Sequence, residues 1–381
     1  RSPSRGLGDV YKRQDWFGGV ILRYGDGALN SSGRSFFLTS RWDEYMGIIG
    51  MPGSTGSNSR DGSPADPVGD LDRAEERCRR DIEADPDNAD ALGDYANFLA
   101  DYRGDYDRAE EMYRRAIEAD PDDSGSLGDY ANFLADYRGD LDRAEEVYRR
   151  AMEADPGNSV NLGNYASFLA DDRGDLDRAG EMFERAIAVD PDDAANLTSY
   201  ATLLNDRGDF DRAEEMYRRA VEADPDNAIV LGNYAVFLMT IRGARSRIKK
   251  LFDRAIAVDP DSAAILSGYA NFLANICHDH DEADEVYRRA VEADPDDGAV
   301  LSDYADFLTD VREDFDRAEE MHRRAVEIDP DDDYILGNYA DFLVNVRGDR
   351  SRAKDVRRRA KEARRRDKEA RRQAKAALKR R

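Results

Sequence analysis

The chain has 381 residues, of which 36% are charged and 40% hydrophobic, and its formal net charge is −25 at pH 7. Such a composition favours a thin, elongated array over a single large hydrophobic core. The sequence contains no apolar run long enough to span a bilayer, which argues against a membrane-embedded chain. The two cysteines, Cys78 and Cys277, provide no disulfide framework and favour a reducing compartment, such as the cytoplasm, over secretion.

The first part of the chain differs from the rest. Residues 4–14 resemble the translation of a sequencing adapter, so we expect residues 1–14 to be an assembly artefact. Residues 15–68 contain both tryptophans and become rich in Gly, Ser, Pro and Asp, which predicts an irregular or disordered segment. A regular array then extends over residues 69–363, and it begins with a second-half helix whose first-half partner is missing.

A repeated segment makes up this array. Successive copies start 35 residues apart, with one spacing of 34, and such regularity predicts an all-α solenoid of about eight units. The same residue type opens each copy: Leu92, Leu127, Leu162, Leu197, Leu231, Leu266, Leu301 and Leu336.

Each copy has the pattern of two helices joined by a tight turn. Residues 92–103 place apolar side chains at helical spacing and predict helix A; residues 106–119 do the same and predict helix B. Between them, Gly104 can adopt the left-handed conformation that ends a helix, and Asp105 can cap the next one. Pro121 then ends helix B, so we expect Asp120 to leave the helix.

This unit resembles the tetratricopeptide repeat, because Leu, Tyr-Ala, Phe-Leu, Gly-Asp, Ala, Tyr, Ala and Asp-Pro recur from residue 71 to about residue 363. Two features depart from the family. A Leu stands where the family usually has Trp, and most copies carry an extra residue near the end of helix A, such as Tyr102. The resemblance implies a right-handed superhelical solenoid of helix–turn–helix repeats, 34–35 residues each, with helices A on the concave surface, where peptides or partner proteins bind.

Charge is divided unevenly along the chain. Residues 350–381 contain 17 Lys/Arg and 4 Asp/Glu, whereas the array before them is strongly acidic. On helix B, Glu110 precedes Arg114 by four residues, the favourable order for an ion pair on a helix surface. The acidic residues of helix A need another explanation, because they have no such partners.

Positions +2, +5 and +9, counted from the leading Leu, should share the side of helix A that faces away from helix B. Ten of these 24 positions are Asp, eight are Asn, and none is Lys or Arg. We therefore predict a peptide-binding groove formed by Asp94, Asn97, Asp101, Asp129, Asn132, Asp136, Asn164, Asp171, Asn233, Asn271, Asp303, Asp306, Asn338 and Asp341.

The composition of these positions favours one class of partner. An Asn side chain both donates and accepts hydrogen bonds, so a row of them can pair with the backbone of an extended peptide, and the Asp residues favour a basic one. Family members that grip acidic chaperone tails use Lys or Arg here, and a phosphate backbone also needs bases, so both ligands are disfavoured. Two alternatives remain: the Asp and Asn residues only solvate an idle face, or the acidity reflects a salt-adapted organism.

No pattern in the sequence supports catalysis, a cofactor or a metal site. The repeated Arg-Gly-Asp triplet, as at Arg103, is explained by turn chemistry rather than by cell adhesion. The segment from Cys277 to His280 holds three metal-type ligands, but it occupies the A–B turn and lacks a distant fourth ligand. We therefore expect a non-enzymatic scaffold for protein partners.

The basic end of the chain allows further hypotheses. Residues 364–381 continue the last helix B without Gly or Pro, which predicts a long basic helical extension. The simplest role is a solubilising cap. Others are intramolecular docking on the acidic groove, or contact with nucleic acid through residues 350–381 alone, which makes the protein an RNA-associated adaptor; a purely architectural spacer is the third class.

Overall fold

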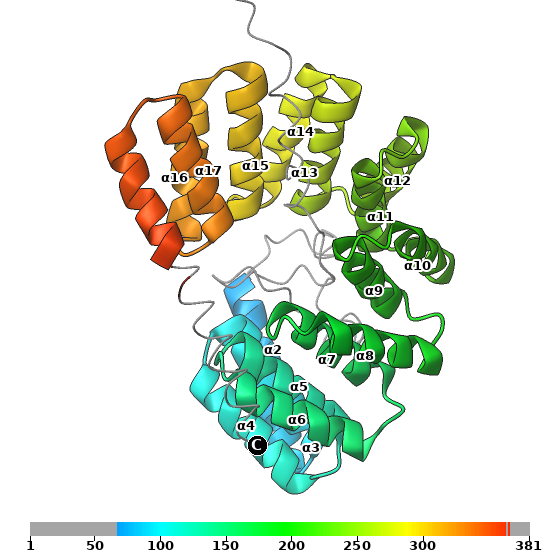
Figure 1. The fold of residues 1–381 in the computed structure, drawn as a ribbon. Helices are drawn as coiled ribbons and strands as arrows, with labels where there is room; N and C mark the ends of the chain where they lie inside the picture. Colours follow the sequence, from blue (N-terminus) through cyan, green and yellow to red (C-terminus); the bar gives the residue numbers. More distant parts are fainter. Residues whose placement is uncertain (1–66, 363–364, 366–381) are drawn as a thin grey trace, which may run out of the picture. The chain divides into compact units, whose positions relative to one another are not determined.

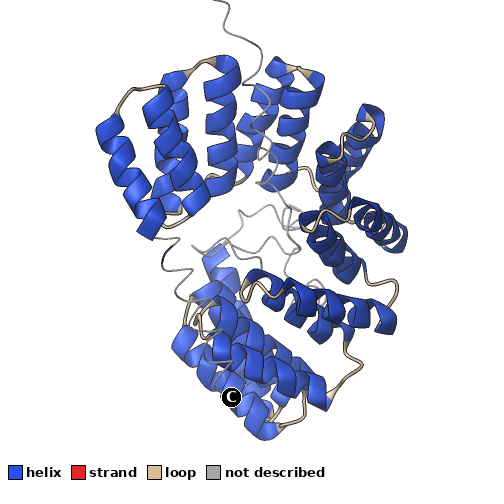
Figure 2. Ribbon diagram, viewed as in Figure 1, coloured by secondary structure: helices blue, strands red, loops and turns tan. Residues whose placement is uncertain are grey.

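The structure, a computed structural model, describes residues 67–362 and residue 365, and in this part of the chain every regular element is a helix (Figure 2). The predictions for residues 1–66, and for the extension apart from Arg365, lie outside the described residues. None of the described helices is long and apolar enough to cross a membrane. The all-α solenoid of helix pairs predicted from the repeat is confirmed.

The helices form two compact units (Figure 1), here called the N-terminal unit, residues 67–223, and the C-terminal unit, residues 224–360. The N-terminal unit contains α2 (Pro67–Ala84), α3 (Ala89–Phe98), η2 (Leu99–Arg103), α4 (Tyr106–Ala119), α5 (Ser124–Asp136), α6 (Leu141–Ala154), α7 (Ser159–Asp171), α8 (Leu176–Val189), α9 (Ala194–Asp206) and α10 (Phe210–Ala223). The C-terminal unit contains α11 (Ala228–Thr240), α12 (Arg245–Val258), α13 (Ala263–Phe272), η3 (Leu273–Cys277), α14 (His280–Ala293), α15 (Gly298–Phe307), η4 (Leu308–Arg312), α16 (Phe315–Ile328), α17 (Asp333–Asn345) and the helical residues 350–360.

The predicted turn chemistry is confirmed. Gly104 has φ 61°, in the left-handed region, and the Asp105 side chain accepts a hydrogen bond from the backbone N–H of Arg108. Helix α4 ends at Ala119, and Asp120 is extended with φ −134°. The Arg-Gly-Asp triplet therefore joins two helices, because its Gly ends one and its Asp caps the other.

The extra residue near the end of helix A widens the last helical turn. In the first copy it forms the π-helical turn η2, and the Asp105 N–H donates to the carbonyl of Leu99, six residues earlier. In the shorter copy the Asp209 N–H donates to Leu204, five residues earlier. The insertion is thus absorbed within one turn, and helix B starts in an equivalent place.

Small and aromatic side chains pack the helices of each pair together. Ala96, Ala109 and Ala116 have no exposed surface, which lets the backbones approach closely, while Tyr95 and Tyr113 are buried between the helices. The sequence interpretation of these five residues is therefore confirmed, and most later copies in the described chain repeat the arrangement. Ile248 replaces the Ala109-type residue in one copy, and His322 and Arg357 replace the Tyr113-type residue in the last two.

Buried carboxylates connect successive repeats. Glu145 on α6 is 1% exposed, and its carboxylate lies 2.9 Å from both Arg149 and Arg173 and 3.2 Å from Arg178. The hydroxyl of Tyr165 donates to it at 3.3 Å. Arg173 and Arg178 belong to the next repeat, so one carboxylate holds two repeats together.

The same position explains a correction to the sequence analysis. Glu110 does pair with Arg114 at 2.5 Å, but it is only 8% exposed and is not a surface group. It also contacts Arg138 at 2.9 Å and Arg143 at 3.2 Å, both from the next repeat. The Arg of the Arg-Gly-Asp triplet thus pairs with a carboxylate of the preceding repeat, as in Arg103 with Glu75 and Arg347 with Glu319. Arg312, which Glu313 and not Gly follows, pairs with Asp284 in the same way.

One interface reverses the charges of this network. Lys249 occupies the position of Glu110 and Glu145, and its Nζ donates to the hydroxyl of Tyr269 at 3.1 Å. In the next repeat Cys277 replaces the triplet Arg, and Glu282 replaces the second Arg. The substitutions are complementary, because an Arg at either position would lie close to the Lys249 ammonium.

Candidate functional site

Within each unit, every helix A packs against the next helix A along the chain. The side chains at positions +2, +5 and +9 lie on these neighbouring helices; together they are called the A-helix stripe below. The sequence predicts the peptide-binding groove at these positions, and their hydrogen bonds show how far the side chains are already engaged.

At three interfaces between repeats, the side chain at position +5 of one repeat hydrogen-bonds to that at position +2 of the next. Asn97 Nδ2 donates to Asp129 at 3.1 Å, and Asn271 Nδ2 donates to Asp303 at 3.2 Å. Between the next two repeats the residue types are exchanged, and Asn338 at +2 donates to Asp306 at +5 with a distance of 2.9 Å. Asn and Asp residues therefore hold neighbouring A helices together, and the amide nitrogen of Asn338 donates to Ser302 Oγ as well, at 3.3 Å.

Helix B also reaches the stripe from within its own repeat. The hydroxyl of Tyr113 donates to Asn97, that of Tyr148 donates to Asn132, and that of Tyr217 lies 3.0 Å from Thr202 Oγ1. Where helix B carries Phe at this place, position +5 is Ser or Val; where it carries Arg357, the partner is Asp341 at 2.7 Å. The +5 side chains of these copies thus contact helix B of their own repeat, although the sequence analysis places them on the side of helix A that faces away from it.

Burial differs among the predicted residues. Asn164, Asn233 and Asp303 are buried, whereas Asp171 and Asp341 are exposed. The others are half-buried: Asp94, Asn97, Asp101, Asp129, Asn132, Asp136, Asn271, Asp306 and Asn338. Most of the predicted residues are therefore partly exposed to solvent and partly covered by neighbouring side chains.

The N-terminal unit contains one strongly perturbed acid on the stripe. Burial raises the pKa of Asp101 to about 6, although a hydrogen bond from the Tyr137 hydroxyl opposes the shift, and the neighbouring charge of Asp129 adds to it. Tyr137 was not among the predicted site residues. It follows the leading Leu by ten residues, where Tyr102 also stands, and Tyr102 stacks on Phe98 with ring centroids 5.6 Å apart.

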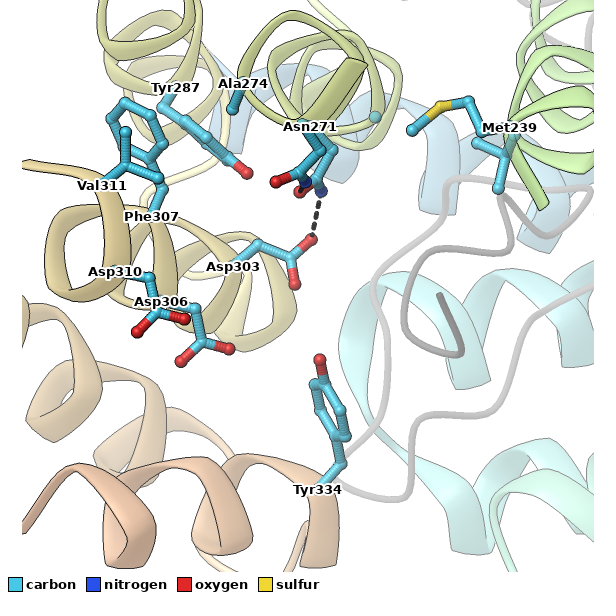
Figure 3. Close-up of a pocket in the computed structure, with 13 residues that line it drawn as sticks. Met239, Asn271, Ala274, Tyr287, Asp303, Asp306, Phe307, Asp310, Val311 and Tyr334 are labelled. Atoms are coloured by element: carbon cyan, nitrogen blue, oxygen red, sulfur yellow. Dashed lines mark hydrogen bonds between the residues drawn. The ribbon is translucent and has the colours of Figure 1, made fainter. Parts of the chain in front are cut away.

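The C-terminal unit has a cavity of about 130 Å³ on its stripe (Figure 3). The predicted residues Asn271, Asp303 and Asp306 line it, and Asp310 lies one turn further along. Met239, Phe307 and Tyr287 contribute apolar and aromatic wall. Every lining residue lies on helices of the C-terminal unit: α11, α13, α14, α15 and α17 together with η3 and η4.

Asp303 is the most unusual group in this cavity. Its Oδ2 accepts hydrogen bonds from Ser267 Oγ at 3.1 Å and from Asn271 Nδ2 at 3.2 Å. Burial raises its pKa to about 7, and the two hydrogen bonds lower it only partly. Near neutral pH this carboxyl is therefore present in both protonation states.

Tyr334 is a cavity residue that the sequence analysis missed. It is 44% exposed and its hydroxyl is directed towards the side of the cavity that carries Asp303 and Asp306 (Figure 3). It stands two residues before Leu336, where the other copies carry Asp, Gly, Val, Ala or Ile. An aromatic residue at this position, in one copy alone, was the signal in the sequence that could have identified Tyr334 as a site residue.

Two sequence profiles described as tetratricopeptide repeat match the chain, one at residues 68–125, 102–171, 137–203 and 170–235, the other at residues 278–333. Together they cover more than half of the sequence. The chain belongs to the tetratricopeptide repeat family. A comparison with curated protein sequences gave no match.

Solved tetratricopeptide structures share the fold. Yeast Tom70 has 16% sequence identity, with a TM-score of 0.53 over 81% of this chain and 87% of Tom70. A tetratricopeptide repeat protein from Parabacteroides merdae also has 16% identity and a TM-score of 0.53, over 67% of this chain and 99% of that protein. Tetratricopeptide proteins are generally non-catalytic scaffolds, and their fold is typical of protein–protein interaction.

Proposed function

We propose that this tetratricopeptide protein is a scaffold whose A-helix stripe binds an extended, basic peptide segment. The observation that carries the proposal is the composition of the stripe. Ten of its 24 positions are Asp and none is Lys or Arg, whereas helices B balance their acids with Arg. A stripe that served only to stay hydrated would not need this separation of the two helix types.

The hydrogen bonds along the stripe support the proposal. Asn97, Asn271 and Asn338 each use one amide N–H to hold a carboxylate of the adjacent repeat, which fixes the rotamer of both groups. Fixed side chains lose little conformational entropy when a ligand binds. Asn338 directs its amide nitrogen to Ser302 as well. The amides of Asn97 and Asn271 have a second N–H that can donate to a peptide carbonyl, so these Asn residues can recognise a backbone while the Asp residues select for charge.

Fluorescence anisotropy with the full chain tests the proposal. The probes are two labelled peptides of about nine residues, one alternating Lys and Ala and one alternating Glu and Ala. We expect the Lys peptide to bind more tightly by at least about tenfold at low salt, and the difference to shrink as salt screens the charges. Equal binding of both peptides, or none, would contradict the proposal.

A pair of variants distinguishes peptide binding at the stripe from a general effect of the protein's negative charge. Asp129→Asn removes a stripe carboxylate and leaves its partner Asn97 a similar acceptor, whereas Asp107→Asn removes a nearly fully exposed carboxylate on helix B. Only the first should weaken the Lys peptide. Equal losses would mean that the peptide responds to overall charge and not to the stripe.

The hypotheses for the basic end of the chain remain predictions. Residues 366–381 lie outside the described structure, so docking on the stripe or binding of nucleic acid is judged by the same assay. If removing residues 364–381 raises the affinity for the Lys peptide, the segment competes for the stripe. A salt-dependent RNA shift that is lost on removing residues 350–381 would instead favour the adaptor hypothesis.

A further inference from the structure

Two substitutions in the stripe contribute to the lining of the cavity in the C-terminal unit. Between most repeats the +5 and +2 residues are polar, but here they are Val236 and Gly268. The backbone of Gly268 is closely packed, because a Cβ atom placed there would come within 3.6 Å of Val236 and 3.3 Å of the Phe252 ring. This part of the lining therefore lacks the polar side chains that the other +5 and +2 positions carry.

The walls of the cavity are of two kinds. Met239, Phe307 and Tyr287 provide apolar and aromatic surface. Asp303, Asp306 and Asp310 follow one another at helical spacing on α15 and η4, and Phe307 lies on the same helix beside them (Figure 3). The lining, all of it within the described chain, includes no Lys or Arg.

A buried, unpartnered imidazole lies behind this acidic wall. His322 on α16 has no exposed surface, and neither ring nitrogen has a hydrogen-bond partner. Its Nε2 is directed at Asp306, 3.7 Å from Oδ1, which is too long for a hydrogen bond. Burial lowers the pKa of His322 to about 4, so the ring is neutral at pH 7 and does not offset the charge of Asp306.

We propose that the cavity binds the side chain of one lysine or arginine residue of the peptide. The inference rests on the proposed function and deepens it, because it assigns one anchoring position. The alkyl stem packs against Met239 and Phe307, the cation is held between Asp303 and Asp306, and the exposed ring of Tyr334 covers the entrance.

The arrangement matches what a long cationic side chain needs. Its methylene groups require apolar contact and its charged end requires a carboxylate, and the two must be separated by the length of the stem. Asp303 is held in place by Ser267 and Asn271, so it does not have to be ordered when the ligand arrives. A bound cation also favours its ionised form, so binding at pH 7 should release up to about half a proton.

A double-mutant cycle tests the inference with the full chain. The Lys-Ala peptide is compared with versions in which each Lys in turn is replaced by norleucine, and the protein is compared with Asp306→Asn. We expect one norleucine peptide to bind about tenfold more weakly to the wild type and nearly equally to the variant. A parallel peptide with Arg at the sensitive position tells which cation fits better.

Asp316→Asn is the matched control. Asp316 lies on helix B of the C-terminal unit, outside the stripe; its side chain is 92% exposed and pairs with Arg347 at 2.6 Å. We expect a change of less than about twofold. If the norleucine replacement and Asp306→Asn weaken binding independently of each other, the cavity does not bind the cationic side chain, but the proposal that the stripe binds a basic peptide is unaffected. If no basic peptide binds the wild type, both proposals fail.

Calorimetry provides a second readout that a structural defect would not imitate. Binding of the Lys-Ala peptide is measured at pH 7 in phosphate and in Tris, whose ionisation enthalpies differ. We expect proton release by the wild type and a clear reduction of it in Asp303→Asn. Equal release by both proteins would overturn the role of Asp303 in holding the cation.

Discussion

Replacing Glu145 by Gln should destabilise the array because it removes the charge that three arginines share. Glu145 is 1% exposed, and Arg173 beside it has a side-chain exposure of only 5%. Breaking a buried ion pair costs about 3–5 kcal/mol, because one charge is left without its partner. Arg149 and Arg178 are 42% and 38% exposed and can turn to water, so we expect a loss of about 2–3 kcal/mol.

Glu319→Gln is the matched control for this prediction. Glu319 occupies the equivalent place and contacts Arg347 at 2.6 Å and Arg352 at 2.7 Å, but its side chain is 23% exposed and both arginines are partly solvated. We expect a loss of about 1 kcal/mol. Denaturant unfolding followed by circular dichroism gives the order of the two midpoints, and hydrogen exchange in α6 and α7 locates the effect of Glu145→Gln.

The pH dependence provides a further check. Burial alone would raise the pKa of Glu145, but the hydrogen bond from Arg149 and the charges of Arg173 and Arg149 lower it below its usual value overall. The stabilisation is therefore present above the unfolded-state pKa and is lost as pH falls through the folded-state pKa. If Glu145→Gln costs no more than Glu319→Gln, or costs the same at low pH as at pH 7, the reasoning about this buried carboxylate is refuted.

Three other changes have defined outcomes. Asp303→Asn should gain stability relative to the wild type as pH rises towards 7, because the native pKa of about 7 lies above the unfolded value and the wild type loses stability as the buried carboxyl ionises. Thermal unfolding at pH 5 and pH 8 should show a gain of up to about 3 kcal/mol between the two pH values. Gly139→Ala should cost about 1–2 kcal/mol because φ is 62°, whereas Gly337→Ala, with open space around its Cβ, should be neutral or gain up to about 1 kcal/mol in the same melts. Lys249→Glu should lower the free energy of unfolding by less than about 1 kcal/mol, seen as a slightly lower melting temperature. Adding Cys277→Arg should restore the melting temperature, and a double variant that stays as unstable as Lys249→Glu would contradict the interpretation that the charges are reversed at this interface.

The helices and turns could be predicted from the sequence because their signals are local. Gly104 and Asp105 define one boundary and Pro121 the other, and each acts within one or two residues of itself. The periodic leucines then fix which face each helix buries. The extra residue at Tyr102 was visible as an insertion, but its form as a π-helical turn was not, because a wider turn and a longer loop look alike in one sequence.

The contacts between repeats were not predicted, since they depend on the lateral register of neighbouring helices. Glu110 was interpreted as a surface group from its spacing to Arg114, although the next repeat buries it. The pairing of Asn97 with Asp129 spans 32 residues and has no signature in either segment alone. The cavity was missed for the same reason, because its lining combines Gly268 and Tyr334 from different repeats.

Hydrogen exchange of the full chain with and without the Lys-Ala peptide is the most direct test of the central claim. If the A-helix stripe binds a basic peptide, the peptide should slow exchange in the A helices, above all in α13 and α15, and leave the exposed face of the B helices unchanged. The Glu-Ala peptide should slow neither. Protection confined to B helices, or equal protection by both peptides, would contradict the account.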